Sequence, residues 1–125
     1  MSVSRAVATA RLFAQRARLP APTADSLAIL VEEWMANIVE HGGADPRSLI
    51  TLRMEPLGEG ARLSISDAGV AFDPRRFTMQ GPNAVRGGGA GIAMIRAWSR
   101  IADYRRSGGR NRLVLEIPPD MGGRA

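Results

Sequence analysis

The chain has 125 residues, of which 45% are hydrophobic, so it can bury one core and is too short for two domains. Its 17 basic side chains, all arginine, exceed the 12 acidic ones and give a net charge of +5. The absence of cysteine excludes disulfides and thiolate metal sites, and the single histidine excludes a multi-histidine metal site.

Two further exclusions concern the membrane and nucleic acid. The sequence has no apolar run approaching the roughly 18–20 residues of a membrane span, and residues 1–18 show no secretion signal, so we expect a cytoplasmic protein without a membrane partner. The arginines are scattered and have few aromatic neighbours, which argues against direct nucleic-acid binding. The alternative, a basic nucleic-acid-binding domain, would show DNA retention that falls steeply with salt.

Two helical patterns open the chain. Apolar residues recur at spacings of three and four over residues 2–18, and two prolines follow. A second apolar stripe over residues 25–41 is expected to face a core, with Thr23 as the N-cap. Gly42 and Gly43 are expected to end this second helix.

The next segments alternate between apolar and polar residues, as strands do. Residues 48–55 and 62–67 are predicted to be antiparallel neighbours, because glycines in the segment 58–60 between them fit a hairpin loop. Residues 70–91 have no clear period and are rich in glycine, proline and arginine, which is typical of a functional loop or lid.

One more helix and a second pair of strands complete the pattern. The helix is predicted over about residues 90–102, and two short strands, 103–106 and 112–117, flank Gly108 and Gly109. Helices on one face of a mostly antiparallel, mixed sheet make a two-layer α+β sandwich. We expect a single domain, with an N-terminal helix and linker over 1–22, a core over 23–117 and a flexible tail over 118–125.

The first candidate site segment lies on the second predicted helix. Glu33, Asn37 and His41 are four residues apart and therefore line one side of the helix, beside its apolar stripe. An amide oxygen there can ligate Mg²⁺, which often completes its shell with phosphates, and a carboxylate can accept a proton. The alternative is an ordinary polar flank of a helix.

The second segment follows a predicted strand and runs from Asp67 to Pro74. A carboxylate only accepts hydrogen bonds, so Asp67 would accept the exocyclic amine of adenine and reject the carbonyl of guanine. Gly69 would let the backbone approach the base. The alternative is a simple Asp-Gly type of turn.

The third segment is a glycine-rich run that leads into a helix, where converging backbone amides favour phosphate oxygens. It lacks the features of a Walker A loop and of a dinucleotide fingerprint. The alternative is a flexible loop closed by a helix. The residues of this segment are Gly87, Gly88, Gly89, Gly91 and Ile92.

The order and spacing of the three segments resemble the nucleotide-binding boxes of the GHKL ATPase superfamily, whose fold is the Bergerat type of two-layer sandwich. The segments 37–42, 72–74 and 104–113 look in particular like those of the anti-sigma-factor serine/threonine kinases in that superfamily. The resemblance covers residues 23–117.

The resemblance implies a role for each residue. Glu33 would be the catalytic base, Asn37 the Mg²⁺ ligand, and Asp67 with Gly69 the reader of adenine in ATP. The glycine-rich segment would close over the phosphates. The remaining expected nucleotide-binding residues are His41, Phe72, Ile92 and, for charge neutralisation at the γ-phosphate, Arg86.

The resemblance also implies a biological role: a kinase that binds a sigma factor or similar regulator and phosphorylates a STAS-domain anti-anti-sigma protein, acting as a homodimer. The alternative is a catalytically weak, ATP-dependent protein-binding module. Two features depart from the family pattern. No strand is expected ahead of the first helix, so the sheet would be smaller or its edge covered by another subunit, and Ala90 stands where leucine is common.

Overall fold

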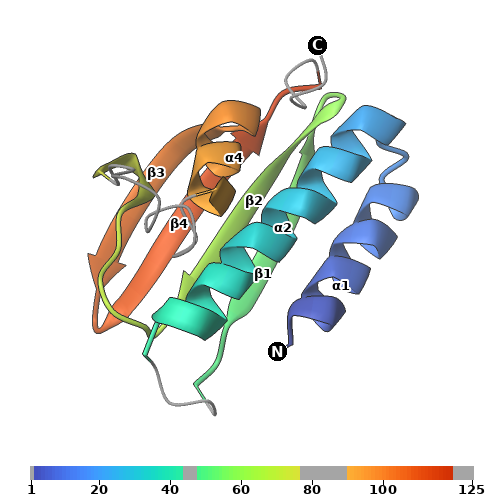
Figure 1. The fold of residues 1–125 in the computed structure, drawn as a ribbon. Helices are drawn as coiled ribbons and strands as arrows, with labels where there is room; N and C mark the ends of the chain where they lie inside the picture. Colours follow the sequence, from blue (N-terminus) through green and yellow to red (C-terminus); the bar gives the residue numbers. More distant parts are fainter. Residues whose placement is uncertain (1, 44–47, 77–89, 120–125) are drawn as a thin grey trace.

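The computed structural model describes residues 2–43, 48–76 and 90–119, which form a layer of helices on one face of a sheet (Figure 1). This is the predicted two-layer α+β sandwich. The elements, in chain order, are α1 (Val3–Arg16), α2 (Ala21–His41), β1 (Thr51–Leu57), β2 (Gly60–Asp67), the short 3-10 helix η1 (Pro74–Arg76), α4 (Ala90–Trp98), β3 (Arg100–Ser107) and β4 (Arg110–Ile117).

The four described strands lie in the order β1-β2-β4-β3. All three neighbouring pairs are antiparallel, so the described part of the sheet contains no parallel pair, where a mostly antiparallel, mixed sheet was expected. The predicted hairpin around residues 58–60 is confirmed, since Leu57 pairs with Gly60. In the central pair, Asp67 at the end of β2 lies opposite Asn111 near the start of β4.

The core lies between the sheet and the helices α2 and α4, which cover it, while α1 packs beside α2 (Figure 1). The predicted apolar stripe of α2 is confirmed, because all four of its members are buried. These residues are Leu27, Val31, Trp34 and Ile38. They meet the inward-facing side chains of β2 and β4, chiefly Leu63, Ile65, Leu113, Leu115 and Ile117.

The start of α2 differs from the prediction. The helix begins at Ala21, directly after Pro20, and therefore one turn earlier than expected. Proline suits the first turn of a helix because its fixed φ is helical and its missing N–H is not needed there. Thr23 is consequently not the N-cap; it is buried inside the helix, and its hydroxyl donates to the Glu59 carbonyl oxygen at 2.8 Å.

The end of α4 also differs from the prediction. The helix stops at Trp98 rather than near residue 102, because residues 100–107 pair with β4 as a longer strand than the expected 103–106. The predicted turn at Gly108 and Gly109 is confirmed, and both have positive φ (59° and 76°), which glycine tolerates best. No strand precedes α1 among the described residues. The described helices are also too short or too polar to cross a bilayer.

Candidate active site

A cavity of about 110 Å³ opens between the C-terminal half of α2, the first turn of α4 and the ends of β2 and β4. It is smaller than the roughly 300–1,000 Å³ of pockets that enclose a whole drug-sized ligand, so its described walls suit a single ring system. Its lining combines apolar and polar side chains: Trp34, Asn37, Ile38, His41, Gly42, Asp67, Val70, Phe72, Ile92 and Asn111.

Five of the residues predicted from sequence share this cavity although they come from three separate segments. They are Asn37, His41, Asp67, Phe72 and Ile92. Gly69 and Gly91 lie in direct contact with other predicted site residues, as described below. Arg86, Gly87, Gly88 and Gly89 lie outside the described residues. Helix α4 begins at Ala90, as expected for the end of the glycine-rich run.

Asp67 is the buried carboxylate of the site, with 4% of its surface exposed. Its Oδ2 accepts hydrogen bonds from the Gly69 backbone N–H at 2.8 Å and from Asn111 Nδ2 at 3.3 Å. The hydrogen bonds found among the described residues leave Oδ1 unused. Because Asp67 lines the cavity, its carboxylate can accept a hydrogen bond from a donor group of a ligand there.

The loop after β2 is held against the end of α2. The Val70 N–H donates to the Gly42 carbonyl oxygen at 2.7 Å. A Cβ on Gly69 would lie 2.8 Å from both that oxygen and Asp67 Oδ2, so no side chain fits at this position. This close approach of two backbone segments brings the carboxylate of Asp67 to the cavity that Asn37 also lines.

Glu33 lies one turn along α2 from Asn37, outside the cavity lining, and is half-buried. Its Oε1 occupies the space beside the first turn of α4, 2.5 Å from where a Cβ on Gly91 would be. Burial raises the pKa of Glu33 above its usual range, and the negative charges of Glu32 and Glu40 add to this effect. A carboxylate with a raised pKa is a better proton acceptor near neutral pH.

Aromatic side chains form the apolar wall of the cavity. The rings of Trp34 and Phe72 stack with a centroid distance of 6.0 Å and an interplanar angle of 29°. Phe72 is tied to β3 as well, because its N–H donates to the Tyr104 hydroxyl at 3.0 Å. Ile92 from α4 is buried and completes this wall.

Asn37 and His41 line the side of the cavity formed by α2. Asn37 is half-buried, and its side chain makes no hydrogen bond among the described residues, so its amide oxygen is available as a ligand. The described residues hold no cluster of three or more carboxylates or histidines suited to a metal. An amide oxygen such as that of Asn37 is a hard ligand of the type that Mg²⁺ accepts alongside phosphate and water oxygens. The His41 side chain is 46% exposed, with Nε2 3.7 Å from a Glu40 carboxylate oxygen.

Sequence reasoning assigned no role to two polar or aromatic residues of the lining, Trp34 and Asn111. The helical periodicity predicts Trp34 only as a member of the apolar stripe. Asn111 does carry a signal in the sequence: it continues the inward-facing row of β4, and an amide in a row of aliphatic residues marks a polar requirement in the core. The rest of that row is Leu113, Leu115 and Ile117.

Comparisons with known proteins agree with this architecture. Two solved structures are similar to the chain, each with 20% sequence identity: the histidine kinase domain of the blue-light-activated histidine kinase of Erythrobacter litoralis EL346 (TM-score 0.56) and that kinase itself (TM-score 0.57). The alignments cover 82% and 85% of this chain, which spans only 48% and 33% of those chains. At 20% identity, this similarity shows the fold alone. A search of curated proteins found no match.

The family comparison covers nearly the whole chain. The model described as "Histidine kinase-like ATPase domain" matches residues 1–117, which include every predicted site residue. The match implies ATP binding and an ATPase-like or kinase-like domain of the GHKL type. The chain therefore belongs to the histidine kinase-like ATPase domain family.

Proposed function

We propose that this domain binds Mg·ATP and transfers the γ-phosphoryl group to a serine or threonine hydroxyl of a STAS-type antagonist protein, as an anti-sigma, partner-switching regulator. The observation that supports the nucleotide site best is the buried Asp67 carboxylate on a cavity that Asn37 also lines, with Oδ1 unused by the described residues. A carboxylate in this place favours the amine of adenine over the carbonyl of guanine.

In this proposal the residues divide the work between base recognition, phosphate binding and proton transfer. Asp67 accepts the adenine amine, and the ring lies against the wall formed by Trp34 and Phe72. Asn37 holds Mg²⁺, which when bound neutralises charge on the phosphates. Glu33, with its raised pKa, orients the attacking hydroxyl and takes its proton.

The phosphate end of the nucleotide would be covered by the segment that opens α4. The proposed contacts are Arg86, Gly87, Gly88 and Gly89, while His41 lines the cavity and Gly91 lies against Glu33. Phosphoryl transfer of this kind requires no covalent intermediate on the protein. Its rate comes from in-line positioning and from donors that meet the developing charge.

The proposed partners rest on the resemblance of segments 37–42, 72–74 and 104–113 to the anti-sigma-factor kinases. A sigma factor or similar regulator and a STAS-domain protein would bind the same domain in turn, and the kinase would act as a homodimer in the cytoplasm. An edge strand is available for pairing between the two copies of such a homodimer, since β1 lies at one edge of the described sheet.

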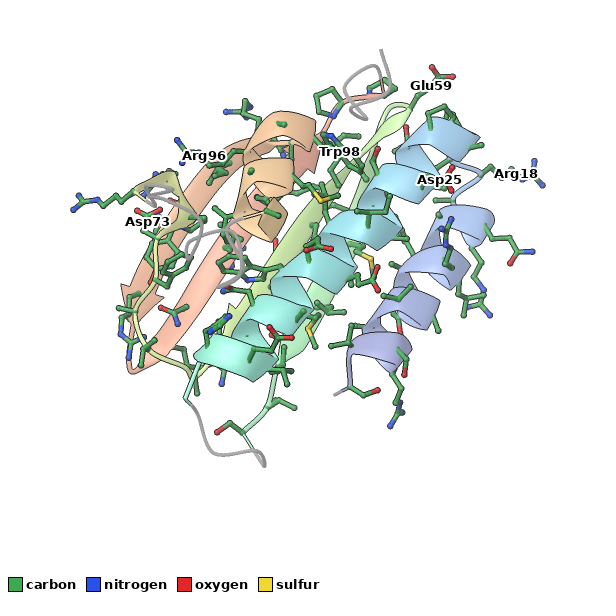
Figure 2. The ribbon with its side chains drawn as sticks, viewed as in Figure 1. Arg18, Asp25, Glu59, Asp73, Arg96 and Trp98 are labelled. Carbon is green, nitrogen blue, oxygen red and sulfur yellow. The ribbon has the colours of Figure 1, made fainter. Side chains whose placement is uncertain are left out.

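Transfer of labelled γ-phosphate from ATP to a purified STAS-domain protein tests this function. We expect Glu33→Ala to abolish transfer and to leave ATP binding within about twofold, because Glu33 lies outside the cavity lining. Glu59→Ala is the matched control: it makes the same truncation at an exposed glutamate in the β1–β2 turn (Figure 2), outside the cavity lining, and should retain the activity. ATP-dependent binding of the STAS-domain protein without transfer, and without any effect of Glu33→Ala, would instead identify an ATP-dependent binding module.

A further inference from the structure

Three side chains of the β3–β4 hairpin, Tyr104, Arg106 and Asn111, form a hydrogen-bond network that we call the hairpin triad. The Tyr104 hydroxyl donates to Asn111 Oδ1, and Arg106 Nη1 donates to the same oxygen at 3.0 Å. The triad also contacts the loop after β2 directly. Arg106 donates to the Gly69 carbonyl oxygen at 2.8 Å, and the Tyr104 hydroxyl accepts the Phe72 N–H.

These bonds fix the orientation of the Asn111 amide. Its oxygen faces a guanidinium of Arg106, which can only donate, so its nitrogen must face the opposite side. There Nδ2 meets acceptors only: Asp67 Oδ2 and the Gly69 carbonyl oxygen at 3.3 Å, and the Val70 carbonyl oxygen at 2.9 Å. A flipped amide would set its N–H groups against Arg106 and its oxygen against a carboxylate and two carbonyls.

The network therefore determines how the Asp67 carboxylate is presented. Rotation about the last side-chain bond of aspartate is soft, so the carboxylate needs donors to hold one orientation. Asn111 and the Gly69 N–H both bind Oδ2, which leaves Oδ1 without a donor among the described residues of the cavity that Asp67 lines. The triad also binds the loop at Gly69, Val70 and Phe72, so both the carboxylate and its backbone are held from β3 and β4.

We propose that the hairpin triad is the positioning device of the base-binding site, and that it sets the preference for adenine over guanine although none of its three residues acts on the reacting atoms. The proposal rests on the proposed binding of ATP at Asp67. The physical reason is that distinguishing adenine from guanine requires a carboxylate oxygen that is held in one direction. A carboxylate that is free to turn would still bind nucleotides, but with less distinction between the two bases.

Tyr104→Phe is the most economical test, since it removes one hydroxyl and keeps the ring. Two measurements are made: affinities for Mg·ATP and Mg·GTP by calorimetry, and amide hydrogen exchange in the nucleotide-free protein by NMR. We expect affinity for Mg·ATP to fall about tenfold with Mg·GTP affinity unchanged. The amides of Phe72 and Gly69 should also exchange faster, because the loop has lost one of its anchors.

Thr23→Val is the matched structural control. It also removes one hydroxyl hydrogen bond, at the other end of β2, where the buried Thr23 donates to the Glu59 carbonyl oxygen. It should lower thermal stability without changing the ratio of Mg·ATP to Mg·GTP affinity. Arg106→Met repeats the test at an exposed residue if Tyr104→Phe fails to fold, since its aliphatic stem is kept.

The outcomes separate this proposal from the proposed function. Suppose that the wild-type protein prefers Mg·ATP and that a triad variant keeps both this preference and the same amide protection. This result overturns the role of the triad but does not contradict the nucleotide site. A wild-type protein without base preference overturns Asp67 as the base reader. In that case, unchanged hydrogen exchange of the Phe72 and Gly69 amides in the triad variant also refutes the positioning role. Faster exchange of these amides supports the claim that the triad holds the loop after β2.

Discussion

Substitution of Gly91 by alanine tests the contact between α4 and the proposed base, Glu33. The new Cβ would lie 2.5 Å from Glu33 Oε1, while its other two nearest atoms, also in Glu33, lie at 3.4 and 3.5 Å, which are ordinary contact distances. Only the carboxylate has to yield. To go from 2.5 Å to a normal contact of 3.4 Å, the oxygen must withdraw by about 0.9 Å.

The effects on stability and on chemistry should separate. The carboxylate ends a flexible side chain and can rotate at low cost, and alanine favours a helix over glycine by up to about 1 kcal/mol. We therefore expect the melting temperature of Gly91→Ala to stay within about 5 °C of wild type. A displacement of about 1 Å in a catalytic group can cost on the order of 100-fold in rate, so turnover should fall by about that factor.

Single-turnover conversion of labelled ATP, with circular dichroism and calorimetry on the same preparations, is the assay. Gly91→Ala should approach the turnover of Glu33→Ala while binding Mg·ATP with an affinity close to wild type. Unchanged turnover in Gly91→Ala would refute the reasoning, because it would show that the position of Glu33 beside α4 does not matter for the chemistry. A parallel loss of ATP affinity would refute it as well.

Three further substitutions test other parts of the site and the sheet. In Gly69→Ala the new Cβ would lie 2.8 Å from the Gly42 carbonyl oxygen, and this backbone atom cannot move aside as a side chain can. Chemical denaturation should therefore show that the free energy of unfolding falls by about 1–3 kcal/mol. Glu33→Gln should melt at a higher temperature than wild type above the usual carboxyl pKa of 4.5, and the difference should vanish below it, because a raised pKa means that ionised Glu33 opposes folding. Glu116→Gln should behave in the opposite way: hydrogen bonds from Arg100 and Arg62 lower the pKa of Glu116, so its stabilisation is present above pH 4.5 and is lost as the pH falls. Melting curves between about pH 3 and about pH 8 distinguish these signs, and a pH-independent difference in either variant would contradict the corresponding prediction.

The layers of the fold were predictable because they follow from local periodicity. The α2 stripe and the two hairpins around residues 58–60 and 108–109 need only spacing and turn chemistry, and the structure has all three. Element ends were less predictable. Thr23 looked like a cap because its type suits one, but Pro20 and Pro22 start the helix earlier, and the buried Thr23 hydroxyl bonds to a carbonyl 36 residues away.

The site was predictable as a set of segments and unpredictable as a set of contacts. Asn37 and Asp67 were selected by motif, and the structure places both on one cavity. The contact of Glu33 with Gly91 depends on how α2 packs against α4, which no local pattern encodes. The same holds for Asn111, which reaches Asp67 only because β2 and β4 pair across 44 residues of chain.

Calorimetric titration with Mg·ATP and Mg·GTP, on wild type and on Asp67→Asn, tests the central claim that Asp67 reads adenine. The wild-type protein should bind Mg·ATP roughly 10- to 100-fold more tightly than Mg·GTP, as expected for a hydrogen bond to a charged group, and the variant should lose this preference. Equal affinity of the wild type for the two nucleotides, or an adenine preference that survives in Asp67→Asn, would contradict the claim.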